Sequence, residues 1–249
     1  MKIIISPAKQ MNSEIDFIDS IGAPVFEQEA LAITTYLNER TFEELKSIWK
    51  CNDQITSQNQ ERLVTALSRK NTVPALLAYV GLQYQYMAPH VFDESQWEYV
   101  NKHLIILSGL YGILQPLDAV SPYRIEMQAK LTPEFSNNKT LYSYWGEKIY
   151  QEITRESNVI LNLASKEYSK VVERYLTEDD QFVTCIFAHL IDGKLKVKAT
   201  EAKMARGEMV RYLASEQITE IEGVKTFAGL GYGYSEEHSD DRTYVFLKR

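Results

Sequence analysis

The chain has 249 residues, enough for one large α/β domain or two small ones, and its hydrophobic share of 45% is ordinary for a globular protein. A formal net charge of −7 argues against a protein that coats nucleic acid non-specifically, although a local basic groove is compatible with that total. Cys51 and Cys185 fit neither a disulfide framework nor a zinc site, which suits a reducing cytoplasm. No apolar run approaches the length of a membrane span, and we expect a cytoplasmic protein without a signal peptide.

The first hundred residues predict one apolar strand followed mainly by helices. Thr41 and Glu44 fit a capping box at the start of a short helix. Apolar positions recur at three and four residues in the other helical segments, which together form a helical insertion at roughly residues 25–100. In chain order we expect a strand over residues 2–5, a loop over 10–24, helices over 25–40, 41–49 and 53–70, a buried strand or turn over 74–81, and a helix from residue 93.

The rest of the chain alternates strands with helices, and no linker or repeat divides it. This order is typical of a mixed α/β sheet with packed helices in a single compact domain. Asp192-Gly193 between two extended segments indicates a β-hairpin. We expect strands over residues 104–107 and 159–163, helices over 145–156 and 167–176, hairpin strands over 182–190 and 194–199, a basic amphipathic helix over 201–215, and an edge strand over 244–247.

Three of the apolar strands end at a serine, namely Ser6, Ser108 and Ser165. Each serine is followed closely by a glycine or a lysine: Lys9, Gly109 and Lys166. In open α/β sheets, ligands bind beyond the carboxyl ends of parallel strands. Hydroxyls, turn amides and lysines gathered there would suit phosphate oxygens. Serine also ends strands simply because it suits turns, and the sequence leaves both interpretations open.

The segment after residue 107 has the layout expected beside a binding cleft. Gly109 and Gly112 let the backbone turn sharply or approach a ligand closely. Arg124 and Glu126 are two residues apart, so on an extended chain both face one side. The same residues would equally suit a tight core connection with an exposed ion pair.

The predicted helix over residues 201–215 adds three further cations. Lys203, Arg206 and Arg211 fall within a broad sector of that helix at about 100° per residue. Gly207 lies among them, where it either permits a close approach or ends a helical turn. A solvated basic face is the ordinary interpretation of such a run. Its coincidence with cations at strand ends favours a shared cleft.

Several common functional signals are missing. The four histidines lack metal-ligand spacing, and the chain contains no P-loop, no nucleophile elbow and no recognisable catalytic triad. We therefore expect no metal site, no cofactor and no catalytic residue.

Six motifs occur in one order over nearly the whole chain. They are ISPAK (5–9), HLIILSGLYGILQPLD (103–118), PYRIEM (122–127), YWG (144–146), NLASKEY (162–168) and KMARG (203–207). In these motifs the chain resembles the YaaA family of bacterial peroxide stress proteins.

That resemblance implies a cytoplasmic protein that keeps free iron low under hydrogen peroxide and so protects DNA. It also implies a single α/β domain with DNA binding in a positively charged cleft. A helix-hairpin-helix element would fall near residues 50–82, but this chain offers only Gly81 where such hairpins carry two glycines, which argues against a phosphate-gripping hairpin. Carried over onto this sequence, the cleft residues are Lys9, Arg124, Lys166, Lys203, Arg206 and Arg211.

Our leading hypothesis is a protein that grips the phosphate backbone of duplex or branched DNA without reading its sequence, with Tyr111, Tyr123 and Tyr168 able to stack on bases. The alternative is an enzyme that acts on a phosphorylated small molecule or nucleotide, with Glu126 as acid or base. A third hypothesis, a protein that binds iron directly, is disfavoured because the sequence has no cluster of metal-ligating residues. Both leading hypotheses use one predicted set of phosphate-binding residues: Ser6, Lys9, Ser108, Gly109, Tyr123, Arg124, Ser165, Lys166, Lys203, Arg206 and Arg211.

Overall fold

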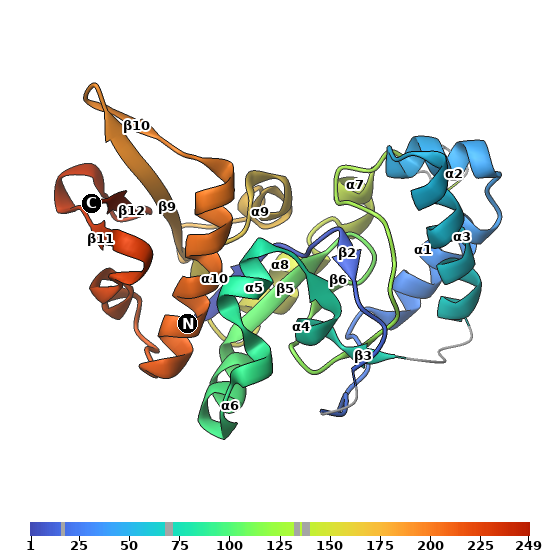
Figure 1. Ribbon diagram of the computed structural model, residues 1–249, viewed down its shortest axis with the longest axis horizontal. Coiled ribbons are helices and arrows are strands. Elements are labelled where there is room, and N and C mark those ends of the chain that lie inside the picture. The colour runs from blue at the N-terminus through green and yellow to red at the C-terminus, as the bar shows by residue number, and fades with distance from the viewer. Residues whose placement is uncertain (16–17, 68–71, 132–134, 136–139) are drawn as a thin grey trace.

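The computed structural model describes residues 1–15, 18–67, 72–131, 135 and 140–249 (Figure 1). Its centre is an eight-stranded, mostly parallel sheet in the order β11-β12-β9-β8-β1-β5-β6, with β10 paired to β9. The predicted α/β class, with a mixed sheet and packed helices in one domain, is confirmed. The strands of this sheet are β1 (Lys2–Ile5), β5 (Leu104–Ser108), β6 (Gly112–Leu114), β8 (Val159–Asn162), β9 (Gln181–Ile191), β10 (Lys194–Lys196), β11 (Tyr232–Tyr234) and β12 (Thr243–Lys248).

Strand β1 lies in the middle of the sheet and is parallel to both of its neighbours. Ile4 aligns with Ile105 of β5 on one side and with Asn162 of β8 on the other. A strand that is covered on both faces needs a continuous apolar run, and Ile3, Ile4 and Ile5 are fully buried. Because the three strands run in one direction, the serines that follow or end them lie at one edge of the sheet, as predicted.

The C-terminal part of the sheet is built on the long strand β9. The predicted hairpin at Asp192-Gly193 is present, with Leu195 of β10 opposite Leu190 of β9, and it protrudes from the molecule (Figure 1). Strand β12 pairs in parallel with β9 and antiparallel with β11. The prediction that the tail forms an edge strand is therefore wrong. The strand that covers it, β11, contains Gly233 and has too few residues to give a strand pattern in the sequence.

Helices surround this sheet, and two small strand pairs lie outside it: β2 (Gln10–Met11) with β4 (Tyr79–Val80), and β3 (Val73–Pro74) with β7 (Ala119–Val120). Helices α1, α2 and α3 pack together at the end of the molecule opposite the β9–β10 hairpin (Figure 1). None of the described helices is long and apolar enough to cross a membrane. The α-helices are α1 (Glu27–Asn38), α2 (Phe42–Trp49), α3 (Asp53–Leu67), α4 (Ala75–Ala78), α5 (Leu82–Met87), α6 (Glu94–His103), α7 (Leu141–Trp145), α8 (Lys148–Thr154), α9 (Lys166–Glu173) and α10 (Ala199–Ser215), and the 3₁₀ helices are η1 (Pro89–Val91), η2 (Ile221–Thr226), η3 (Gly229–Gly231) and η4 (Glu236–His238).

The structure confirms one helix feature predicted from sequence and decides a second that the sequence left open. Thr41 caps α2 in a full capping box with Glu44. Gly207 lies inside α10, where it permits a close approach to α5, because an added Cβ would lie 2.0 Å from the carbonyl oxygen of Gln83. Helix α10 accordingly packs along α5 and α6, whereas α8 packs against α9.

Three element predictions need correction. Within residues 74–81, Ala75–Ala78 form the short helix α4, which lies between the two-residue strands β3 and β4. This apolar run is buried in a compact turn and not in the main sheet. The helix expected over residues 145–156 is split into α7 and α8 by Gly146, whose φ of +51° is left-handed. The loop expected over residues 10–24 contains β2, and residues 16–17 of it lie outside the described part of the chain, as do residues 68–70 of the helix expected over 53–70.

Candidate phosphate-binding cleft

The ends of β1 and β8 are joined by their serines. The hydroxyl of Ser6 donates to Oγ of Ser165 at 3.1 Å, and the amide of Ser165 donates to Oγ of Ser6 at 2.8 Å. Ser108 at the end of β5 has a different structural role. Its Oγ accepts from the amides of Leu110 and Tyr111 and so stabilises the tight turn into β6. The three serines at the strand ends thus have two roles: Ser6 and Ser165 link β1 to β8, and Ser108 caps a turn.

A pocket of about 420 Å³ lies beyond the carboxyl ends of β1 and β8, and we call it the cleft pocket. Its walls come from the loops after these strands and from α5, α9 and α10. Parallel strands place loops from distant parts of the chain at one edge, which explains how the pocket is assembled. Seven of the predicted phosphate-binding residues line it, namely Ser6, Lys9, Tyr123, Arg124, Ser165, Lys203 and Arg206.

Four predicted residues do not line the cleft pocket: Ser108, Gly109, Lys166 and Arg211. Ser108 is fully buried, and Gly109 lies behind the wall, where an added Cβ would be 2.7 Å from the carbonyl oxygen of Ile125. Lys166 pairs with Glu173 of its own helix and faces a second pocket. Arg211 is exposed on α10 beyond the pocket, because five residues rotate it by about 140° from Arg206.

One carboxylate is shared by two of the cleft cations. Oε1 of Glu126 lies 2.9 Å from Nζ of Lys9 and 3.3 Å from Nη2 of Arg124. The side chain of Lys9 remains 64% exposed, so this pair is open to solvent, whereas Arg124 is mostly buried. Arg124 and Glu126 therefore lie on one side of the chain, as predicted. Glu126 contacts both Lys9 and Arg124 and so holds these two cations at the pocket.

Arg206 differs from the other cleft cations because it is largely buried and has no carboxylate partner among the described residues. Its Nε makes no hydrogen bond, and burial lowers the pKa of its guanidinium from the ordinary arginine value. Gln83, which is 7% exposed, also presents an amide nitrogen without a partner at this pocket. Unpaired donors of this kind are costly to bury, so their convergence favours an acceptor-rich ligand such as a phosphate.

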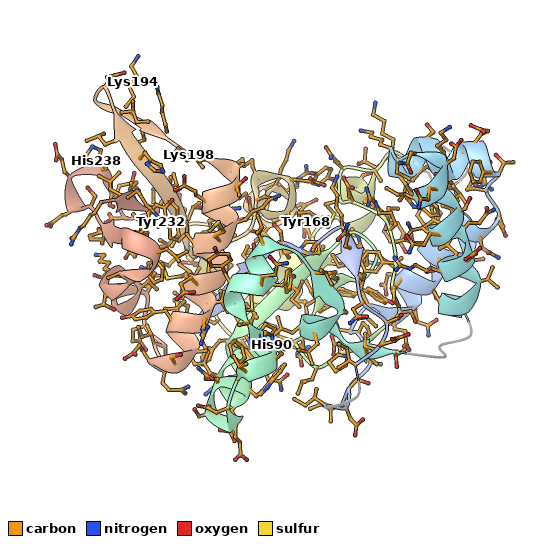
Figure 2. The ribbon with its side chains drawn as sticks, viewed as in Figure 1. His90, Tyr168, Lys194, Lys198, Tyr232 and His238 are labelled. Atoms are coloured by element: carbon orange, nitrogen blue, oxygen red, sulfur yellow. The ribbon has the colours of Figure 1, made fainter. Side chains whose placement is uncertain are left out.

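Tyrosines form the floor of the cleft pocket. The hydroxyl of Tyr123 lies 2.8 Å from that of Tyr79 and 2.7 Å from Oγ of Ser108, and burial raises the pKa of Tyr123 far above its ordinary value. Tyr84 donates to the carbonyl of Ser6 at 2.9 Å. Tyr168 lies near the middle of the molecule (Figure 2), and like Tyr123 it is only 7% exposed. These rings are committed to packing, which leaves little surface on which a base could stack.

The polar residues of this pocket that the sequence interpretation missed include Gln83, Tyr84 and Glu167. Glu167 is half-buried at the start of α9, and desolvation raises the pKa of its carboxyl above the ordinary value. Its place within the motif NLASKEY was the one available signal. Gln83 and Tyr84 carried no signal, because only the packing of α5 against α10 brings them to the strand ends.

Other kinds of site receive less support within the described ranges. There, no group of three or more His, Cys, Asp or Glu side chains is placed to hold a metal ion. Cys185 is buried in β9, and burial raises the pKa of its thiol, as is usual for a cysteine of the core. The hairpin element considered for residues 50–82 falls partly outside the described residues, and Val73 and Pro74 form strand β3.

Comparison with known proteins agrees with the resemblance seen in the motifs. A UPF0246 protein of Desulfitobacterium hafniense is 50% identical over 248 residues, covering 100% of this chain and 98% of the relative. A UPF0246 protein of Lachnoclostridium phytofermentans is 49% identical over 248 residues, covering 100% of this chain and 96% of the relative. The family model described as peroxide stress protein YaaA matches residues 1–238. The chain therefore belongs to the YaaA family of peroxide stress proteins.

Proposed function

We propose that this chain acts in the cytoplasm during peroxide stress by binding the phosphate backbone of duplex or branched DNA at the cleft pocket, without reading sequence. One observation carries the proposal: cations from three separate segments converge on one pocket of a chain with a net charge of −7. Lys9 follows β1, Arg124 follows β7, and Lys203 and Arg206 belong to α10. Local positive charge in an acidic protein attracts phosphates to that place.

Limitation of free iron is the second part of the proposal, and it rests on family membership. Free ferrous iron reduces hydrogen peroxide to hydroxyl radicals that attack DNA, so a lower level of free iron lowers this damage. A protein that occupies DNA and also lowers free iron would protect the same target twice.

A second candidate function is supported by the size of the cleft pocket. A volume of about 420 Å³ is within the range of small-molecule sites and admits a nucleotide or another phosphorylated compound. In that case Arg124, Lys203 and Arg206 would hold the phosphate, and Glu126 would act as acid or base.

Fluorescence anisotropy with a labelled duplex across a salt series tests the first proposal. Lys9→Ala and Lys203→Ala should each weaken binding and lower the salt slope by about one unit, because each removes one phosphate contact. Arg211→Ala is the matched control, since Arg211 is on α10 but outside the pocket. Equal slopes in all three variants would contradict the proposal. Thermal stabilisation by a nucleotide without any DNA binding would favour the enzyme.

A further inference from the structure

We infer that this chain has a second binding site, for a small amphipathic anion, on the opposite side of the first turn of α9. The site is a pocket of about 740 Å³ over β9, which we call the sheet-face pocket. Its floor is formed by Phe182, Thr184 and Ile186, which alternate onto one face of the strand. This volume is within the usual range for small-molecule sites.

Several polar groups of the sheet-face pocket are paired with one another. Glu173 accepts from Nζ of Lys166 and from the hydroxyl of Ser169. The side-chain amide of Asn162 donates to Oγ1 of Thr184 at 3.1 Å. These groups therefore have little capacity left for a ligand. The lining also contains the carboxylates of Glu178 and Asp180, and Oδ1 of Asp180 makes no hydrogen bond, so an anionic ligand has to place its charge away from them.

Arg206 is the exception among the cations deep in this pocket. It lines the sheet-face pocket as well as the cleft pocket, and no described carboxylate pairs with it. The other cation without a carboxylate partner, Arg242, is exposed at the start of β12. A guanidinium held largely out of water gains most from an anion that brings hydrogen-bond acceptors with it. The anionic group of a ligand would therefore bind at Arg206.

The remainder of the ligand would contact apolar surface. Phe182 and Ile186 provide the floor and Leu176 a wall, while Val197 at the base of the hairpin is 55% exposed. An apolar side chain left half in water at the margin of a cavity is stabilised when a ligand covers it. A carboxylate or phosphate monoester with an apolar body fits both features.

Calorimetric titration with three probes of equal chain length tests the charge requirement. Octanoate and octyl phosphate should bind at one site, and octylammonium should bind at least tenfold more weakly, because it places a cation beside Arg206. Equal binding of octylammonium would overturn the proposal, as would the failure of both anions to bind.

Variants then locate the site. Arg206→Met should raise the Kd of octanoate about tenfold, which is the typical effect of losing one charge-assisted hydrogen bond. Ile186→Trp should abolish binding by filling the pocket, and Val197→Glu should weaken it by repulsion at an exposed position that tolerates substitution. Lys9→Met is the control, because Lys9 lines only the cleft pocket. Unchanged binding in Arg206→Met and Val197→Glu, or an equal loss in Lys9→Met, would overturn the proposal.

A consequence of the shared arginine rests on the proposed DNA binding. An anion bound to Arg206 from the sheet-face pocket would weaken phosphate binding in the cleft pocket, and the coupling must be reciprocal. Octanoate should therefore raise the Kd for duplex DNA in the unmodified protein but not in Ile186→Trp. If the protein binds no DNA, the direct titrations still decide whether the second site exists.

Discussion

The cleft pocket and the sheet-face pocket flank the same helical turn but differ in how their charges are arranged. Ser165 and Glu167 face the cleft pocket, whereas Lys166 and Ser169 face the other. Successive residues of a helix point about 100° apart, so neighbours in the sequence serve different sites. In the cleft pocket the cations come from distant segments and converge. In the sheet-face pocket Lys166 and Glu173 pair with each other, and among the described residues only Arg206 lines both pockets.

The largest expected effect concerns the close contact between Gly207 of α10 and Gln83 of α5. Gln83 lines the cleft pocket but not the sheet-face pocket. Gly207→Ala would place a Cβ 2.0 Å from the carbonyl oxygen of Gln83, so α5 and α10 must separate. We expect the free energy of unfolding to fall by about 3 kcal/mol in urea titrations. Gly193→Ala is the control, because its added Cβ meets nothing, although its φ of +70° should still cost about 1 kcal/mol. Equal losses would show that the close approach is not required.

The second prediction concerns the residue that the pockets share. Arg206→Met should raise the free energy of unfolding by about 1 kcal/mol, because it removes a desolvated charge that has no carboxylate partner among the described residues. Urea unfolding at pH 7 measures the change, with the exposed Arg211→Met as a control expected within about 0.5 kcal/mol of the unmodified protein. A marked destabilisation would mean that the guanidinium has a structural role in the folded chain.

The third prediction separates the cleft pocket from the sheet-face pocket through Glu126, whose carboxylate contacts two cations of the cleft pocket. Glu126→Gln keeps the shape of the side chain but leaves the charges of Lys9 and Arg124 uncompensated. DNA should then bind several-fold more tightly, with a salt slope steeper by about one unit. Binding of octanoate should not change, because Glu126 does not line the sheet-face pocket. Weaker DNA binding would indicate that the carboxylate is needed to position the two cations.

The smallest expected effect is a pH dependence of the cleft pocket. Burial raises the pKa of Glu167 above that of the unfolded chain, so it takes up a proton at a higher pH than an ordinary glutamate. As the pH falls through this raised pKa, the loss of the negative charge should tighten DNA binding by about threefold. Glu167→Gln should remove that part of the pH dependence. An identical pH profile in the two proteins would assign the effect to other groups.

The sequence by itself predicted the central strands, whereas their common carboxyl end rested on an assumed parallel pairing that the structure shows. Continuous apolar runs such as Ile3-Ile4-Ile5 are typical of strands covered on both faces, and once such strands pair in parallel the serines that follow them lie at one end of the sheet. Short-range signals were equally reliable, since the capping box at Thr41 and the hairpin at Asp192-Gly193 depend on residues only a few positions apart.

Only the tertiary structure decided which charged residues share a site. Helix rotation turned Lys166 and Arg211 away from the cleft pocket, and the packing of α5 against Gly207 added Gln83 to it. The covering of β12 by β11 was hidden for a different reason, because a strand of three residues that contains Gly233 gives no strand pattern in the sequence. A residue type and its spacing fix local geometry, whereas convergence depends on contacts between segments that the sequence keeps apart.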